Sequence, residues 1–161
     1  MHVLVTGAAG FIGFHVASAL LARGDTVVGV DNLNDYYDVS LKEARLNQLL
    51  NNKGFSFILA NVADRQALPV ALQDSGDITG IVHLAAQAGV RYSLQAPFAY
   101  TESNVTGHLV MLEMCRQLSG LQHMVYASTS SVYGANEKLP FSVKDPAARP
   151  LSLYAATKGA A

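Results

Sequence analysis

The chain has 161 residues, half of them hydrophobic, which suits a single domain with a sizeable buried core. Its 11 basic and 12 acidic side chains give a net charge of −1, so nucleic acid and anionic membrane surfaces are not expected partners. The only cysteine, Cys115, has no disulfide partner and no metal-ligand residues at suitable spacing. We therefore expect no metal site and a reducing, cytoplasmic compartment. The glycine-interrupted N-terminus lacks the pattern of a signal peptide, and no apolar run approaches the roughly 20 residues of a membrane helix.

Short β-branched runs alternate with helical patterns along the chain. We expect strands at residues 2–6, 26–30, 55–60, 80–85 and 123–127, and helices at residues 11–23, 40–52, 64–73 and about 97–118. In the second helix, Lys42, Glu43 and Arg45 are expected on the solvent side. Strands that alternate with helices imply a parallel sheet, and their nearly continuous apolar sequences imply that helices cover both faces. The sequence therefore predicts an α/β fold in one domain, with a doubly wound sheet in three αβα layers.

A glycine-rich turn joins the first expected strand to the first expected helix. Gly7, Gly10 and Gly13 form a G-x-x-G-x-x-G pattern, and Asp31 follows at the end of the second strand. In a dinucleotide site the first glycine permits the tight turn, the second lets backbone amides approach the pyrophosphate, and the third lets the helix pack on the strand. The carboxylate would accept hydrogen bonds from both hydroxyls of a ribose. The pattern thus predicts a dinucleotide site, and the alternative is a turn that only connects a strand to a helix.

The acidic residue also predicts which dinucleotide binds. A 2′-phosphate next to Asp31 would meet like charge, and the residues that follow directly are Asn32, Leu33 and Asn34, with no arginine among them. NAD is therefore favoured over NADP as the cofactor. Five apolar residues of two expected helices are expected in the core: Phe11, Ile12, Met111, Leu112 and Met114. Phe11 and Ile12 are also expected to flank the cofactor.

Further motifs follow the glycine turn. They are His83-Leu-Ala-Ala86, Asn104, the run Ala127-Ser-Thr-Ser-Ser-Val-Tyr-Gly134, and Tyr154-x-x-x-Lys158. Together these motifs resemble the extended branch of the short-chain dehydrogenase/reductase superfamily, within its NAD-dependent epimerase/dehydratase family. Residues 31–39, 86–93 and 150–158 are similar, more specifically, to the UDP-glucuronate 4-epimerases. The resemblance runs along the whole chain and implies a Rossmann-like fold.

The resemblance concerns only the N-terminal part of that family's proteins. It implies that residues 1–161 are an incomplete NAD-binding domain, truncated after its fifth strand, and that the C-terminal sugar-nucleotide-binding domain is absent. The full-length parent is expected to be a homodimer that binds a UDP-sugar. For the chain alone we expect no activity, poor stability or self-association, and an open sheet edge at the fifth strand. The last helix, from Leu153 to Ala161, is expected to fray around Lys158.

The resemblance also implies which residues contact NAD. They are Gly7, Gly10, Phe11, Ile12, Gly13, Asp31, Asn32, Asn61, Val62, Leu84, Ala85, Ala86, Tyr154 and Lys158. Asn61 stands where the family usually has an aspartate close to the adenine. The affinity for adenine is therefore expected to differ, although an asparagine can still form hydrogen bonds.

Tyr154 and Lys158 are expected to carry the acid–base chemistry. They are spaced to share one face of a helix, and a cation beside the phenol favours its ionised form, so the tyrosine can act as a base near neutral pH. In the mechanism that the resemblance implies, Tyr154 takes the proton of the sugar C4 hydroxyl while NAD receives a hydride. The 4-keto sugar then turns over, and hydride and proton return to give the inverted configuration. Without the surrounding motifs, a tyrosine and a lysine at this spacing would be interpreted as a surface pair.

Substrate contacts are expected from Arg91, Thr129, Ser130 and Ser131. Thr129 is the hydroxyl expected to hydrogen-bond the reacting sugar oxygen. The guanidinium of Arg91 suits the carboxylate of a uronic acid. The alternatives are a solvated loop for the arginine and a polar turn for the hydroxyls.

Three further features are expected to support the site. His83, in an apolar strand end, is interpreted as a packing histidine and Asn104 as a residue that organises backbone near the site. The polar, proline-containing stretch 134–150 is long for a loop, so we expect it to help cover the site.

Two classes of function remain. The first is an NAD-dependent 4-epimerase of a UDP-sugar, with conversion of UDP-glucuronate to UDP-galacturonate as the expected reaction and a dehydratase or decarboxylase of the same superfamily as the alternative. Dehydratases usually carry an acidic pair after the threonine, whereas Ser130 and Ser131 follow Thr129, which favours epimerisation. The second class is a non-catalytic NAD-binding fragment.

Overall fold

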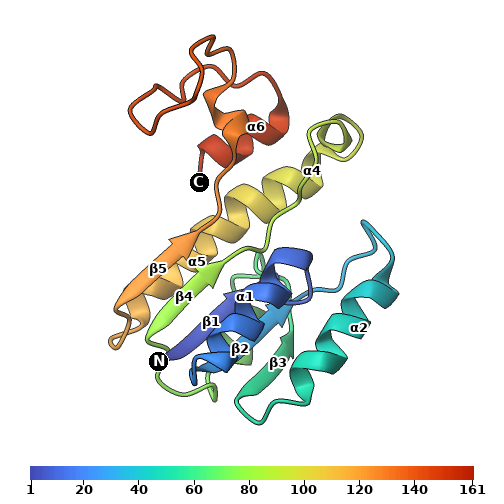
Figure 1. Ribbon diagram of the computed structural model, residues 1–161, viewed down its shortest axis with the longest axis vertical. Coiled ribbons are helices and arrows are strands. Elements are labelled where there is room, and N and C mark those ends of the chain that lie inside the picture. Colours follow the sequence, from blue (N-terminus) through green and yellow to red (C-terminus); the bar gives the residue numbers. More distant parts are fainter.

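Five parallel strands form the central sheet of the computed structural model, which describes residues 1–161 (Figure 1). Their order is β3-β2-β1-β4-β5, so the chain builds outward from β1 to one edge and then crosses back to build the other. The strands are β1 (His2–Thr6), β2 (Thr26–Asp31), β3 (Phe55–Leu59), β4 (Gly80–His83) and β5 (His123–Tyr126). In this register Val5 pairs with Gly29 on one side and with Val82 on the other. The predicted fold class is confirmed.

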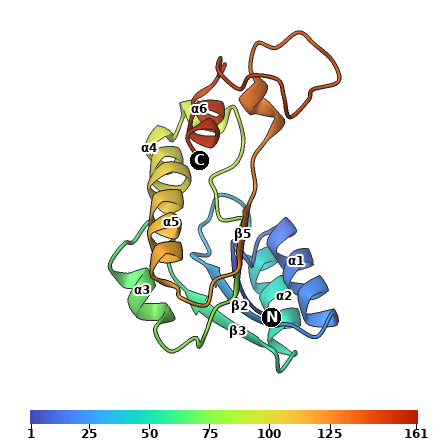
Figure 2. The same ribbon diagram turned by 90° about the vertical axis from the view of Figure 1, so that its left-hand side faces the viewer.

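Helices cover both faces of the sheet, with α1 and α2 on one side and α3 and α5 on the other (Figure 2). The helices are α1 (Phe11–Ala22), α2 (Val39–Leu50), α3 (Ala67–Leu72), α4 (Pro97–Tyr100), α5 (Gly107–Gln117) and α6 (Leu153–Gly159). Shorter turns are the 3₁₀ segments η1 (Tyr92–Leu94) and η3 (Ser130–Tyr133) and the π-helical segment η2 (Thr101–Thr106). Because α4, η2 and α5 follow one another directly, the long helix expected at 97–118 is confirmed, with a π-helical interruption.

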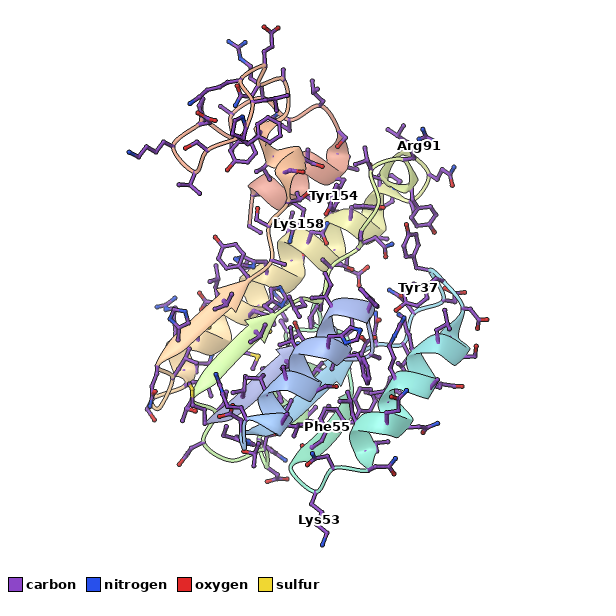
Figure 3. The ribbon with its side chains drawn as sticks, in the orientation of Figure 1. Tyr37, Lys53, Phe55, Arg91, Tyr154 and Lys158 are labelled. Atoms are coloured by element: carbon purple, nitrogen blue, oxygen red, sulfur yellow. The ribbon has the colours of Figure 1, made fainter.

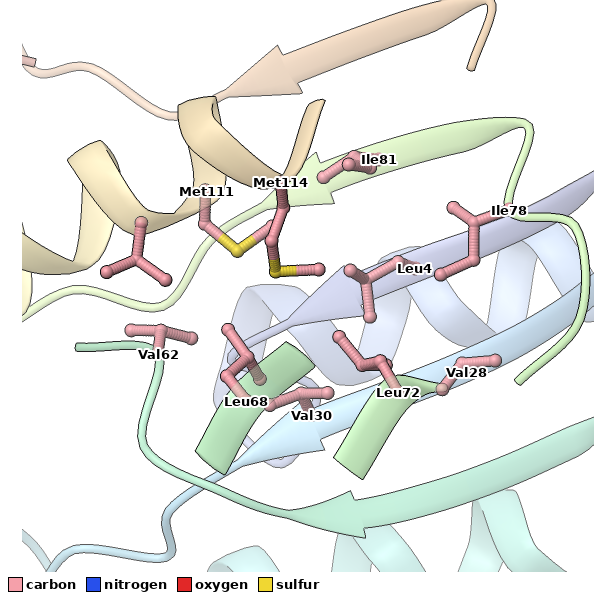
Figure 4. Close-up of a cluster of buried hydrophobic side chains, with 11 residues drawn as sticks. Leu4, Val28, Val30, Val62, Leu68, Leu72, Ile78, Ile81, Met111 and Met114 are labelled. Atoms are coloured by element: carbon pink, nitrogen blue, oxygen red, sulfur yellow. The ribbon is translucent and has the colours of Figure 1, made fainter. Parts of the chain in front are cut away.

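The alternation of side chains along the strands divides the core into two clusters. Toward α3 and α5 the buried residues are Leu4, Val28, Val30, Val62, Leu68, Leu72, Ile78, Ile81, Val110, Met111 and Met114 (Figure 4). Toward α1 and α2 they are Val3, Val5, Ala8, Ala9, Ala17, Val27, Leu46, Leu49 and Phe55. Successive residues of a strand point to opposite faces, so Val3 and Val5 belong to one cluster and Leu4 to the other. Two covered faces explain why the strand sequences are almost wholly apolar.

Three apolar residues that were expected in the core are exposed. Phe11 and Ile12 lie in the first turn of α1 and are 65% and 60% exposed, because the helix turns its small residues toward the sheet. Leu112 is 43% exposed on the outer side of α5, whereas Met111 and Met114 are buried as expected. The core interpretation is therefore wrong for Phe11, Ile12 and Leu112.

β5 pairs only with β4 and forms one edge of the sheet, as expected. Val125 and Tyr126 on this strand are 48% and 45% exposed. Residues 134–150 follow η3 without regular helix or strand (Figure 1). The base of this loop is closed by a hydrogen bond from the Ala135 amide to the Arg149 carbonyl, 3.3 Å long. No helix is long and apolar enough to cross a membrane.

The hydroxyl of Thr6 connects the ends of β1 and β4. Its oxygen accepts hydrogen bonds from the amides of Leu84 (3.2 Å) and Ala85 (3.1 Å), and it lies 2.7 Å from Nδ1 of His83. A hydroxyl has two acceptor sites and one donor, so the O–H donates to Nδ1 and the histidine carries its proton on Nε2. His83 is thus a satisfied, neutral packing residue, as expected. Burial, followed by the charges of His108 and Lys158, lowers the pKa of His83 to about 4.

This histidine makes stability depend on pH. Below its ordinary pKa of about 6.5 the unfolded chain binds a proton that the folded chain does not bind until about pH 4. The free energy of unfolding should therefore fall as the pH drops from 6.5 to 4, by up to about 3 kcal/mol from this group. Urea unfolding at stepped pH measures the slope, which His83→Asn should flatten. His123→Asn, at an exposed position on β5, is the control that should keep the original slope. An unchanged slope in His83→Asn would contradict this account.

Candidate active site

A groove of about 720 Å³, partly open to solvent, crosses the carboxyl ends of β2, β1 and β4. It lies where the strand order changes direction, which is the usual ligand position in doubly wound sheets. Its lining residues are Gly7, Gly10, Asp31, Asn32, Asn34, Tyr36, Tyr37, Lys42, Ala60, Asn61, Val62, Leu84, Ala85, Ala86, Gln87, Ala88 and Ser103. No group of three histidine, cysteine or acidic side chains is placed to hold a metal ion.

The glycine turn brings α1 into direct contact with the end of β1. Gly7 has a φ of 71°, and a Cβ there would lie 2.8 Å from the Ala85 amide nitrogen. A Cβ on Gly13 would lie 2.0 Å from the Gly7 carbonyl oxygen. By contrast, a Cβ on Gly10 would meet only that oxygen, at 3.1 Å, and would otherwise occupy open space. Gly7 and Gly13 are therefore required by packing, and Gly10 keeps space clear in front of the helix.

The start of α1 is arranged to receive an anion. Gly10 is the N-cap and supplies no side-chain hydrogen bond, and the first turn contains no acidic residue. The amides at this end of the helix therefore have no side-chain acceptor, the helix dipole favours negative charge there, and Gly10 itself lines the groove.

The packing of Gly13 gives a direct stability prediction. Gly13→Ala would force the turn and the helix apart, because the added Cβ meets backbone rather than a movable side chain. We expect the free energy of unfolding to fall by about 3 kcal/mol or more in chemical denaturation. Gly159→Ala is the control, since a Cβ there has nothing within 4 Å, and it should be close to neutral. Equal stability of the two variants would show that α1 does not pack on Gly7 in this way.

Asp31 is held at the end of β2 by backbone amides. Its Oδ2 accepts from the Ala9 amide at 3.1 Å, and its Oδ1 accepts from the Leu33 amide at 2.9 Å. Nζ of Lys42 lies 3.8 Å from the same Oδ1 and donates to Oδ1 of Asn34 at 2.8 Å. Burial lowers the pKa of Lys42, and the neighbouring carboxylate of Asp31 opposes that shift. The carboxylate keeps acceptor capacity toward the groove, as a pair of ribose hydroxyls would require.

The interpretation that placed Lys42 on the solvent side of its helix is wrong. Lys42 is only 5% exposed and lies on the same face of α2 as the buried Leu46 and Leu49. These three residues recur at helical spacing, a signal in the sequence for the inner face that does not by itself show which partner compensates the buried charge. Arg45 is also partly buried beside the groove. Two cations thus lie near Asp31 in space although none follows it directly in sequence.

Asn61 follows β3 and also lines the groove. Its Nδ2 donates to Oε1 of Glu102 at 3.0 Å, and its Oδ1 accepts from the Ala63 amide at 3.0 Å. Both ends of this amide are therefore engaged within the chain. The predicted effect on adenine affinity stays a prediction.

Tyr154 and Lys158 come from α6, which packs against η3 and η2 (Figure 3). The Ser152 hydroxyl caps the helix by accepting from the Ala155 amide at 3.0 Å. The ring of Tyr154 meets Tyr100 edge to face, with centroids 6.0 Å apart. Lys158 is 9% exposed, and burial lowers its pKa. The expected fraying around Lys158 is therefore not what the structure shows, because tertiary packing covers this turn.

Asn104, in the π-helical segment, ties α6 to the groove. Its Oδ1 accepts from the Gln87 amide at 2.8 Å, while its Nδ2 donates to the Gln87 carbonyl and to Oγ1 of Thr157, both at 3.1 Å. This side chain organises backbone near the site, as expected.

The expected substrate residues lie on two loops. Thr129 is the N-cap of η3, and its Oγ1 accepts from the Ser131 amide at 3.2 Å. Within η3, Ser130 is exposed and Ser131 is partly buried. Arg91 is exposed at the start of η1, at the outer end of the loop after β4 (Figure 3).

The groove thus gathers most, but not all, of the expected cofactor residues. Those in its lining are Gly7, Gly10, Asp31, Asn32, Asn61, Val62, Leu84, Ala85 and Ala86, whereas Phe11, Ile12, Gly13, Tyr154 and Lys158 are not. Lining residues that sequence reasoning missed are Asn34, Tyr36, Tyr37, Lys42, Ala60, Gln87, Ala88 and Ser103. None of residues 134–150 lines the groove. The arrangement can bind an anion at α1 and a diol at Asp31, with the tyrosine and lysine predicted as an acid–base pair on the adjoining α6.

Residues 4–161 match the family model described as GDP-mannose 4,6 dehydratase. The chain is 55% identical over 160 residues to an uncharacterized 37.6 kDa protein of Escherichia coli O111:H-, covering 99% of this chain and 47% of that protein. It is 51% identical over 158 residues to UDP-glucuronate 4-epimerase 4 of Arabidopsis thaliana, covering 98% of this chain and 36% of that protein. The chain therefore spans half or less of the length of these relatives.

Solved structures show the same fold. UDP-glucuronic acid 4-epimerase from Bacillus cereus, crystallised with UDP-glucuronic acid and NAD, matches with a TM-score of 0.86 and 38% identity, covering 99% of this chain and 49% of that chain. UDP-glucose 4-epimerase of Thermus thermophilus, in complex with NAD, matches with a TM-score of 0.81 and 38% identity, covering 99% and 48%. The likeness extends over nearly the whole of this chain.

Proposed function

Because this chain belongs to the GDP-mannose 4,6 dehydratase family and is 51% identical to a UDP-glucuronate 4-epimerase, we propose that it is the NAD-binding and acid–base part of a sugar-nucleotide C4 epimerase. UDP-glucuronate is the proposed substrate and UDP-galacturonate the product. The observation that carries the proposal is α6, where the buried Lys158 lies one turn from Tyr154 and the adjacent Thr157 is hydrogen-bonded to Asn104, which also holds Gln87 in the groove lining. The same family assignment confirms the resemblance that the motifs indicated.

The residues of the groove fit NAD. The free amides at the start of α1 suit its pyrophosphate, and the absence of a side chain at Gly10 leaves room for the phosphates to approach them. The carboxylate of Asp31 suits the hydroxyls of its adenosine ribose. When bound, NAD accepts a hydride from the sugar C4 and returns it to the opposite face of the resulting ketone.

Tyr154 is the proposed general base and acid. Its phenolate takes the proton of the C4 hydroxyl as the C4–H bond breaks, and the same oxygen returns that proton when the ketone is reduced. Lys158, one helical turn away, is the proposed charged donor to that oxygen, because a cation in a site that excludes water interacts strongly with a nearby negative charge. Thr129 holds the C4 oxygen: its Oγ1 already accepts from the Ser131 amide, and its O–H remains free to donate.

Substrate recognition is proposed for the two loops beside α6. Ser130 and Ser131 offer neutral hydroxyls next to Thr129. The guanidinium of Arg91 forms no hydrogen bond or ion pair within the chain, and its planar donors suit the carboxylate of a uronic acid.

A dehydratase is the alternative, and the name of the family model favours it. Elimination of water needs an additional acid to protonate the departing hydroxyl, and the residues after Thr129 are the neutral Ser130 and Ser131. This composition supports epimerisation.

Cofactor binding is tested by Gly10→Ala. The added methyl group occupies space in front of α1 and meets only the Gly7 carbonyl oxygen, at 3.1 Å, so the variant should fold with a melting temperature lowered much less than that of Gly13→Ala. Its affinity for NAD in titration calorimetry should fall about tenfold or more, because the phosphates lose their close approach to the amides. Gly159→Ala should bind NAD as the unsubstituted chain does. Equal binding by Gly10→Ala, or no binding of NAD by any form, would contradict the proposed site.

The acid–base role is tested in a hybrid, since the chain spans about half of its solved relatives. Residues 1–161 replace the matching segment of the Bacillus cereus enzyme, and inversion at C4 of UDP-glucuronate is followed by NMR. Tyr154→Phe should lower the turnover rate about a hundredfold or more while NAD affinity is retained, because only the transferable proton is lost. Tyr133→Phe, which removes a hydroxyl from η3, is the matched control. Turnover by Tyr154→Phe close to that of the unsubstituted hybrid would show that another group is the base.

A further inference from the structure

The ribose side of the groove contains cations that the proposed reaction does not use. The ammonium of Lys42 has three donors, of which one is taken by Oδ1 of Asn34 at 2.8 Å. Its separation from Oδ1 of Asp31 is 3.8 Å, an ion pair that is too long for a hydrogen bond. Lys42 lines the groove and is 5% exposed. The structure thus places a nearly buried ammonium, with donors to spare, where a ligand would meet Asp31.

Arg45 lies beside this ammonium. Its Nη1 donates to the Ala9 carbonyl at 3.3 Å and to the Tyr37 hydroxyl at 3.1 Å. Both cations make cation–π contacts with the Tyr37 ring, whose centroid lies 5.0 Å from Nζ of Lys42 and 5.9 Å from the guanidinium carbon of Arg45. Figure 3 shows Tyr37 on the segment between β2 and α2, and Tyr37 also lines the groove.

The orientation of Asp31 does not depend on Lys42. Two backbone amides, those of Ala9 and Leu33, hold its two carboxylate oxygens. The carboxylate therefore stays in place as a single negative charge facing Lys42, while Arg45 contacts Tyr37 and Ala9. Asp35 is the other acidic side chain whose charge acts on Lys42.

We propose that Lys42 determines specificity for the adenosine ribose, and that with Arg45 it forms a 2′-phosphate site that the carboxylate of Asp31 keeps closed. This inference rests on the proposed function, because it takes the adenosine of the dinucleotide to lie at Asp31. The carboxylate of Asp31 accepts from the ribose hydroxyls and repels a phosphate. Where a neutral side chain replaces it, Lys42 in the groove lining and Arg45 beside the groove no longer have that opposing charge, and a 2′-phosphate gains charge-assisted hydrogen bonds. Discrimination against NADP thus depends on one side chain, and not on a lack of basic residues.

The test is titration calorimetry of the chain with NAD and NADP, supported by AMP and adenosine 2′,5′-bisphosphate as probes of the ribose end alone. The variants are Asp31→Asn, Lys42→Met and the double variant of these two. Lys53→Met, alone and combined with Asp31→Asn, is the matched control. Lys53 is exposed at the end of the molecule away from the groove (Figure 3), so this change removes the same charge without touching the site. Thermal melting verifies that each variant folds.

We expect Asp31→Asn to raise the ratio of NADP to NAD affinity about tenfold or more, the effect of a charge-assisted hydrogen bond. The double variant with Lys42→Met should lose that gain, whereas the one with Lys53→Met should keep it. Lys42→Met alone should shift the ratio toward NAD, which gives a readout even if Asp31→Asn does not fold. If the gain survives in the Lys42 double variant, or Lys42→Met leaves the ratio unchanged, Lys42 is only structural and the inference fails. Binding of neither dinucleotide by any variant would instead overturn the proposed function.

Discussion

The site depends on the contact between the start of α1 and the end of β1. A side chain at Gly13 would collide with the Gly7 carbonyl, and a side chain at Gly7 would collide with the Ala85 amide after β4. The turn is therefore compressed between a helix and a neighbouring strand end, and only glycine permits both approaches. This contact fixes the start of α1 beside the groove and brings the groove wall after β4 close to the glycine turn. The close approaches that shape the groove are thus possible because Gly7 and Gly13 have no side chains.

The groove wall after β4 is irregular in conformation, yet it is fixed by side chains from regular elements. The hydroxyl of Thr6 on β1 holds the amides of Leu84 and Ala85, and the amide group of Asn104 holds the backbone of Gln87 from both sides. Buried backbone groups need partners, and after β4 ends no strand supplies them. Threonine and asparagine side chains take over this role, which keeps the segment rigid without a ladder of strand hydrogen bonds.

Much of this arrangement was predictable, because its signals are local. The apolar strands, the spacing of Gly7 to Gly13 and the pair Tyr154 and Lys158 are each recognisable within one element and its neighbours. The misplaced residues are those whose positions depend on distant partners. Lys42 was assigned to solvent from its charge, but it is buried because Asp31 and Asn34, on the segment at the end of β2, compensate it.

The π-helical segment was not predictable either, for a similar reason. An ordinary helical repeat continues through the residues around it, and nothing in their composition marks an interruption. Such segments shift the angular position of the residues that follow, often at functional sites. Here the segment contains Asn104, whose side chain reaches backbone more than a helical turn away in sequence. The interruption is associated with a tertiary contact, the one between Asn104 and Gln87, so the sequence pattern within one helix does not reveal it.

The same asparagine explains how a seven-residue helix holds an acid–base pair. A helix as short as α6 is not stable by itself in water, since isolated helices need about 12 to 15 residues to be even marginally populated. Its support is external: Ser152 caps its start, Ala155 is buried, and Thr157 is bonded to Asn104. Thr157 directly precedes Lys158, so the bond from Asn104 fixes the turn from which the lysine projects. Asn104 also fixes Gln87 in the groove wall. One side chain therefore positions both the groove, where a dinucleotide would lie, and the helix that carries Tyr154. The distance between the groove and the proposed base is therefore set by the packing of η2 and does not require α6 to be stable alone.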